Sequence, residues 1–149
     1  MSNKERKHIK VTYSTLASPD PLLHEYYDEA VAEAKANFGQ TFPLFINGKE
    51  RFTDETFAKV SPVDTDIVMG HFQKGSSQDA EDAIAAAKAA FPAWSGRPWQ
   101  ERVVILRKAA DLISERLFHM GAVMSLEVGK NRLEALGDVE ETADLIRYN

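Results

Sequence analysis

The chain has 149 residues, no cysteine, and a net charge of −5 from 18 basic and 23 acidic side chains. Its length and 44% hydrophobic content allow one average domain with a core. The mild negative charge lacks the basic patch of a nucleic-acid partner, and no apolar run approaches the ~20 residues that cross a bilayer. The absence of cysteine excludes disulfides, thiolate metal ligands and a cysteine nucleophile within these residues. We therefore expect a soluble, cytoplasmic protein with no nucleic-acid and no membrane partner.

The N-terminal third is predicted to contain an arm followed by one helix. Residues 1–19 begin with a basic run that Glu5 interrupts, which is typical of an extended or disordered, solvated arm. Ser18 to Pro21 then supply capping and first-turn residues, and apolar side chains recur at helical spacing up to Gly39. This pattern predicts a helix over residues 20–38.

Short strands follow this helix. Asn47-Gly48 tolerates positive φ at both central turn positions, so residues 42–52 are predicted to form a short hairpin. The turn-rich stretch 61–65 then leads into an apolar run over 67–72, which is typical of a strand. A second strand pair or an edge strand would accommodate it.

An alanine-rich helix comes next. Ser76 or Ser77 caps it, and carboxylates in its first turn meet the positive end of the helix dipole. Pro92 is predicted to end the helix, because proline lacks the N–H that the helix interior needs. Trp94 and Trp99 flank the following loop, and we expect them to pack helices together.

Two further helical regions complete the pattern. Gly121 is predicted to split or bend the first of them, Gly129 is a candidate C-cap, and a last helix is predicted from about Asn131 to the chain end. No closing cap follows Tyr148. The apolar faces that we expect to pack partly on further domains carry Leu106, Ile113, Leu117 and Met124.

The stretch from Gly70 to Ser77 has two glycines at the separation found in a phosphate-binding loop, between a predicted strand and a predicted helix. Ser76 stands where such a loop has its phosphate-binding lysine, so an ordinary strand-to-helix turn is the better interpretation. The sequence contains no G-x-G-x-x-G. We therefore predict no cofactor-binding residue in this chain.

Candidate metal and acid–base residues are sparse. His24 and Asp28 are four residues apart on the predicted helix, but no third metal ligand is indicated, so both are expected at the surface. His71 and His119 lie among apolar residues, where a hydrogen-bonded structural histidine is expected. No serine occupies a nucleophile elbow. We predict no catalytic residue and no metal site.

The last helix is the one element with a candidate binding residue. Carboxylates at three- and four-residue steps, with arginines nearby, predict a solvated face of weak ion pairs. If another domain covered this face, Glu141 would become a cleft carboxylate able to bind an ammonium group. The carboxylates concerned are Glu134, Asp138, Glu141 and Asp144.

Several stretches together resemble the start of the aldehyde dehydrogenase superfamily. The final stretch, from Glu127-Val128-Gly129-Lys130-Asn131 through Asp138 to Tyr148, is most similar to the 1-pyrroline-5-carboxylate dehydrogenase branch, as is the extra helix before Phe42. The other stretches are Phe42–Glu50, Ser61–Asp64, Asp82–Trp94 and Arg102–Ile113.

This resemblance implies an α/β parent fold, of which the present segment is mostly α-helical with a few short β-strands. Residues 20–149 would form the N-terminal, incomplete part of a cofactor-binding domain. The family oxidises aldehydes with NAD through a cysteine thiolate, an oxyanion hole and a glutamate base, and whether NADP is accepted stays open. Glu141 matches the position that faces the amino group of glutamate γ-semialdehyde in that branch.

Two hypotheses follow. The chain is the N-terminal portion of a homo-oligomeric dehydrogenase that converts glutamate γ-semialdehyde to glutamate in proline catabolism, with the segment inactive alone. Alternatively, it is a free-standing, non-catalytic helical interaction or assembly module derived from that family.

Overall fold

The computed structural model describes residues 9, 11, 15 and 17–148. These residues are mostly helical with a few short strands, as predicted. The helices are α2 (Pro21–Ala36), α3 (Ser77–Ser95), α4 (Trp99–Glu115), α5 (Leu117–Val128) and α6 (Arg132–Tyr148). The strands are β1 (Thr41–Phe42), β2 (Leu44–Ile46), β3 (Lys49–Arg51), β4 (Thr56–Val60) and β5 (Val68–Gln73).

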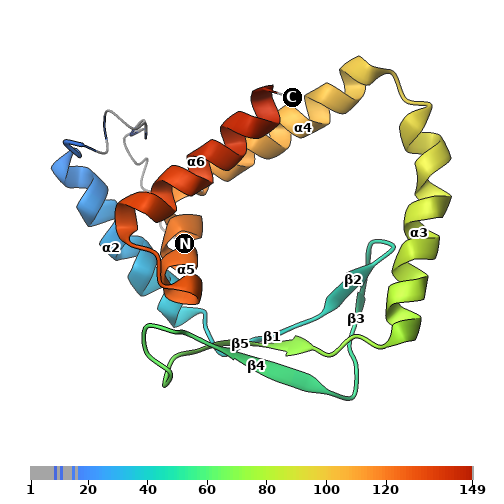
Figure 1. Ribbon diagram of the computed structural model, residues 1–149, viewed down its shortest axis with the longest axis horizontal. Coiled ribbons are helices and arrows are strands. Elements are labelled where there is room, and N and C mark those ends of the chain that lie inside the picture. Colours follow the sequence, from blue (N-terminus) through green and yellow to red (C-terminus); the bar gives the residue numbers. More distant parts are fainter. Residues whose placement is uncertain (1–8, 10, 12–14, 16, 149) are drawn as a thin grey trace.

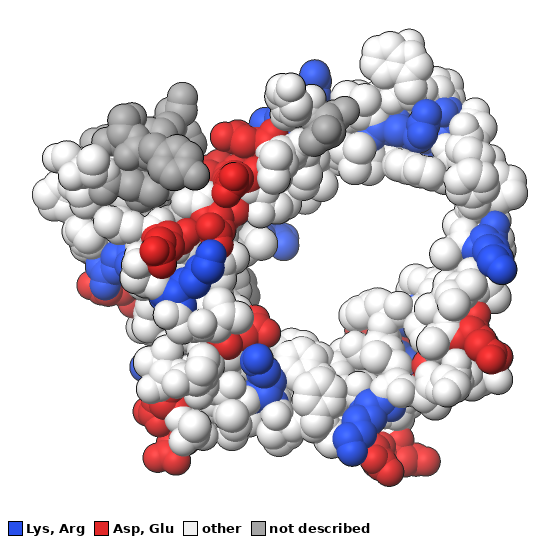
Figure 2. Space-filling model, in the orientation of Figure 1, with Lys and Arg blue, Asp and Glu red and all other residues white. Residues whose placement is uncertain are grey.

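The elements form an open ring (Figure 1). Helices α2, α5 and α6 gather on one side, α4 runs along α6, and α3 stands on the opposite side, with the strands closing the ring between them. An opening passes through the ring even when all side chains are drawn as spheres (Figure 2). The chain therefore encloses a space that its own described residues do not fill.

The core lies where α2, α5 and α6 meet. Its buried side chains include Leu23 and Tyr27 from α2, Phe118 from α5 and Leu136 from α6, and Val11 from the N-terminal stretch joins them. Burial of this apolar area is the main favourable contribution to folding of this region. The rest of the predicted arm over 1–19 lies largely outside the described residues.

Gly121 does not split a helix, which corrects that part of the prediction. It lies buried within α5, and a Cβ at this position would come within 2.8 Å of a methyl carbon of Leu136. The missing side chain at Gly121 therefore allows α5 and α6 to approach each other closely. The break falls at Arg116, between α4 and α5.

The start of α2 confirms the predicted first helix. Asp20 caps it by accepting a hydrogen bond from the Leu22 N–H at 3.0 Å, and Pro21 occupies the first turn. Further along, the Tyr27 hydroxyl donates to Ser125 Oγ at 2.5 Å and ties α2 to α5.

Two small sheets follow. The predicted hairpin is confirmed as the antiparallel pair β2–β3, with Asn47 and Gly48 both at positive φ. The predicted strand over 67–72 is β5, which pairs with β1 in parallel and with β4 antiparallel. Gly70 is required here, because a Cβ would lie 2.7 Å from the ring of Phe42, which stacks on Phe72 at 5.2 Å.

Helix α3 differs from its prediction at its end. It continues through Pro92 to Ser95, and the Gly96 N–H donates to the Pro92 carbonyl at 3.0 Å. Pro92 cannot donate the bond that this position would give to the Lys88 carbonyl, yet the helix continues for three further residues before it ends. Trp94 and Trp99 are 40% and 63% exposed, so the expected packing role is wrong within the described chain.

The remaining helix predictions are mostly confirmed. Gly129 ends α5 with a φ of 75°, and α6 begins at Arg132. The apolar face expected to be uncovered is only partly so: Leu106 is 46% exposed, whereas Leu117 is buried against the core. The prediction for Leu117 fails because α5 turns inward after Arg116.

Candidate functional site

The exposed face of α6 carries the predicted ion pairs. The Lys130 ammonium contacts Asp138, and Arg147 binds Asp144 at 3.2 Å and Asp111 at 3.3 Å. The hydrogen bond that the Lys130 ammonium donates to Asp138 raises the pKa of Lys130, and the charges of nearby carboxylates raise it further. Acidic side chains gather over α6 in Figure 2. This face therefore presents alternating, mostly paired charges.

Glu141 lies on this face and is exposed. Its sequence neighbour Glu140 accepts a hydrogen bond from the Ser114 hydroxyl at 3.0 Å, which ties α6 to α4. Among the described residues, Glu141 has no hydrogen bond and no ion pair, and it acts on Lys130 only through space. The structure thus leaves the Glu141 carboxylate available to a partner from outside the described chain.

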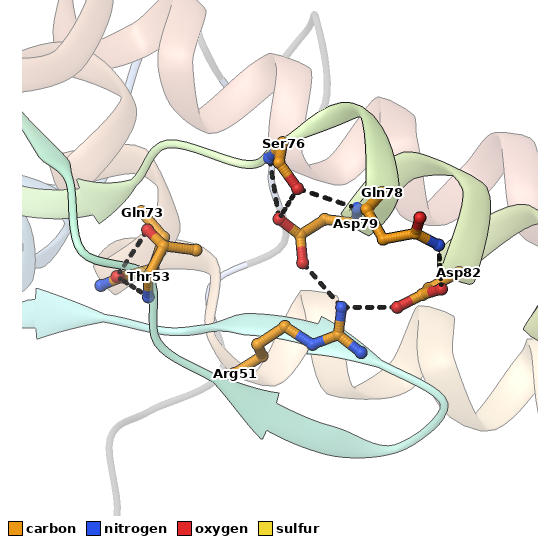
Figure 3. Close-up of polar contacts among 7 residues, drawn as sticks. All are labelled: Arg51, Thr53, Gln73, Ser76, Gln78, Asp79 and Asp82. Carbon is orange, nitrogen blue, oxygen red and sulfur yellow. Dashed lines mark hydrogen bonds and ion pairs between the residues drawn. The ribbon is translucent and has the colours of Figure 1, made fainter.

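The stretch that resembled a phosphate-binding loop is closed by its own carboxylate (Figure 3). At the start of α3, Asp79 Oδ2 accepts from both the N–H and the hydroxyl of Ser76, each at 2.7 Å. Arg51 reaches across from β3 to Asp79 at 2.6 Å and to Asp82 at 2.8 Å. Arg51 and Ser76 lower the pKa of Asp79 to about 2.

Two consequences follow for a nucleotide. The helix N-terminus that would attract a phosphate already holds a carboxylate, so a second anion would be repelled. The arginine that could bind a phosphate is already engaged by two aspartates. This turn therefore does not fit the phosphates of a nucleotide, which agrees with its interpretation as an ordinary strand-to-helix turn.

A buried glutamine joins the hairpin to the larger sheet, and sequence reasoning missed it. Gln73 Oε1 accepts from the Thr53 N–H at 2.8 Å, and Gln73 Nε2 donates to the Phe42 carbonyl at 3.0 Å. Figure 3 shows the contact with Thr53. The only sequence signal was a polar residue at the end of an apolar strand, which does not reveal its backbone partners.

His24 and His119 lie in different surroundings. Arg132 donates to His24 Nδ1 at 2.9 Å and binds Asp28 at 2.6 Å, with its guanidinium 4.6 Å from the centre of the Tyr27 ring. A side-chain cation thus occupies the place considered for a metal, and no metal-binding group occurs in the part of the chain that the structure describes. His119 is exposed, which corrects its expected structural role.

The comparisons with known proteins agree with this architecture. The model of the aldehyde dehydrogenase family matches residues 49–149. The chain therefore belongs to the aldehyde dehydrogenase family. Within the described residues, no helix is long and apolar enough to cross a membrane.

Its relatives point to one branch of that family. The chain is 36% identical over 124 residues to 1-pyrroline-5-carboxylate dehydrogenase of Staphylococcus saprophyticus, and 33% identical to 1-pyrroline-5-carboxylate dehydrogenase 2 of Bacillus subtilis. Each match covers 83% of this chain and 24% of the relative. The chain thus spans about a quarter of the length of these relatives.

Solved structures show the same fold. A 1-pyrroline-5-carboxylate dehydrogenase from Thermus with bound NAD matches with a TM-score of 0.85 and 30% identity, over 99% of this chain and 28% of that one. The corresponding enzyme of Mycobacterium tuberculosis, at 24% identity and a TM-score of 0.80, shares the fold over 96% of this chain and 26% of that one.

Proposed function

We propose that this chain is the N-terminal part of an NAD-dependent 1-pyrroline-5-carboxylate dehydrogenase. The complete enzyme would oxidise L-glutamate γ-semialdehyde to glutamate in proline catabolism, as a homo-oligomer in the cytoplasm. The observation that carries the proposal is the agreement in sequence and fold with enzymes of this name over more than four fifths of the chain. NAD is the expected cofactor because a matching structure holds it.

Under this proposal the chain has a supporting role in the chemistry. A thiolate nucleophile must come from another part of the protein, since these 149 residues contain no cysteine. We expect the cofactor site to lie elsewhere too, and the closure of the strand-to-helix turn before α3 by Asp79 supports this expectation. The 149 residues alone are expected neither to oxidise aldehydes nor to bind NAD.

Glu141 is the residue that we propose to contact the substrate. Glutamate γ-semialdehyde carries an α-ammonium group, and an available carboxylate on α6 is its natural partner once the rest of the enzyme covers this face. The exposed Glu141 side chain, without an ion pair among the described residues, supports this assignment. Asp138 and Asp144 on the same helix are already paired with Lys130 and Arg147.

The test is Glu141→Ala in the complete enzyme, assayed with two aldehydes. Loss of a charge-assisted hydrogen bond should lower kcat/KM for glutamate γ-semialdehyde about ten- to a hundredfold. Glutaric semialdehyde has the same chain length without the amino group, so it should change little. Glu134→Ala, two turns earlier on α6, is the matched control. Equal losses for both aldehydes would remove Glu141 from the substrate site.

The alternative is a free-standing interaction module. The observation in its favour is that α2, α5 and α6 form a buried core from this chain alone. An intact-mass measurement on the protein purified from its natural source separates the two. A mass near 16.6 kDa would support the module, and a mass several times larger would support the dehydrogenase.

A further inference from the structure

A cavity of about 470 Å³ lies where α2 and α5 meet the three-stranded sheet. This volume is within the usual range of small-molecule sites. The wall of the cavity that the sheet forms is well packed, because Met69 is buried and the ring of Phe42 stacks on that of Phe72. The apolar part of the wall consists of Ala34, Phe38, Phe42, Met69, Phe72 and Val123.

Two carboxylates at this cavity occupy unfavourable positions for their own helices. Glu33 lies in the last turn of α2 and Glu127 in the last turn of α5, and both line the cavity. The C-terminal end of a helix carries negative partial charge, so a carboxylate there is repelled. The last turn of α5 contains no basic residue, and Lys35, the basic residue in the last turn of α2, does not line the cavity.

Neither carboxylate has a local counterion. Among the described residues, the side chains of Glu33 and Glu127 make no hydrogen bond and no ion pair. Lys59 from β4 also lines the cavity, but it forms no ion pair with either of them. Two carboxylates and two helix C-termini therefore face the single ammonium of Lys59, which favours a negative potential at the cavity.

We infer that this cavity binds a small organic cation. Its apolar, preferably aromatic, body lies against Phe42 and Phe72, and its ammonium group lies near Glu33 and Glu127. The aromatic rings add to the attraction of a cation, and the two helix C-termini favour the same charge. This site is separate from Glu141 and does not depend on the proposed oxidation of an aldehyde.

The experiment is calorimetric titration of the complete protein that contains this chain with 2-phenylethylammonium. The matched probe is 3-phenylpropionate, which has a similar ring and length and the opposite charge. We expect binding of the ammonium and at least tenfold weaker binding of the carboxylate. Equal affinity for the two probes, or no binding of the ammonium, would overturn the inference.

Variants locate the binding within the protein. Glu33→Gln and Glu127→Gln should each weaken binding about three- to fivefold, as expected for partly exposed charges, and the double variant about tenfold or more. Glu25→Gln, on the exposed part of α2 outside the cavity, is the matched control and should change nothing. Val123→Phe should abolish binding by filling the cavity without altering charge. Full affinity in Val123→Phe would place the ligand elsewhere.

Discussion

Alanine has different roles on the two sides of the ring. On one side, Ala30, Ala122 and Ala135 are fully buried where α2, α5 and α6 approach one another. On the other side, α3 is rich in alanine, yet none of its residues is buried. Alanine permits close packing in the first region and supplies intrinsic helicity in the second.

The ring thus has one region with a buried core of its own, formed by α2, α5 and α6, and one helix without buried residues, α3. We call this helix the α3 arm. The helical side stabilises itself by burial, whereas α3 relies on its capping box and on the ion pairs from Arg51. Ile84, Phe91 and Trp94 on α3 remain 55%, 65% and 40% exposed. Under the proposed function, the remainder of the dehydrogenase covers this arm.

The sharpest test of this contrast is a pair of truncations to alanine. Leu136→Ala removes a fully buried side chain and should lower the free energy of unfolding by about 2–5 kcal/mol. Ile84→Ala, on the arm, should change it by no more than about 0.5 kcal/mol. Chemical unfolding of the chain measures both. Similar losses at the two positions would show that α3 has a core of its own.

A smaller, local effect is expected at Pro92. Pro92→Ala restores a backbone N–H within α3, and alanine is favoured over proline in a helix interior by up to about 3 kcal/mol. Because the arm contributes little to the core, the gain should appear as slower amide exchange near residues 88–95. The melting temperature of the chain should stay unchanged. A clear rise in that temperature would contradict the separation of the two regions.

Within the core, the hydroxyl of Tyr27 should have a measurable role. Tyr27→Phe removes its hydrogen bond to Ser125, and we expect a loss of about 1 kcal/mol in the free energy of unfolding. Tyr148→Phe is the control, because Tyr148 is 89% exposed. Equal effects for the two tyrosines would mean that the contact between α2 and α5 does not contribute.

The weakest expected effect is the pH dependence of the arm. The folded-state pKa of Asp79 is lowered from 3.8 to about 2, chiefly by the hydrogen bond from Arg51. Its contribution to stability is therefore complete above about pH 4 and is lost as the pH falls from about 4 towards 2. A carbon-detected NMR titration of the Asp79 carboxyl measures the pKa. Arg51→Met should return it towards 3.8, and no change in that variant would contradict the assigned cause.

The sequence by itself determined the elements whose signals are local. Asp20 and Pro21 specified the start of α2, Asn47-Gly48 specified the hairpin, and Gly129 specified the end of α5, because caps and turns depend on a few neighbouring residues. Motifs over most of the chain also indicated the family.

Only the tertiary structure decided which surfaces are covered. Gly121 is a packing residue because Leu136, 15 positions along the chain, lies against it. Arg132 finds His24 and Asp28 more than 100 residues away, and Glu33 and Glu127 meet at one cavity from two different helices. Periodicity marks a face as apolar or charged, but the partner of that face is set by long-range packing, which no local pattern encodes.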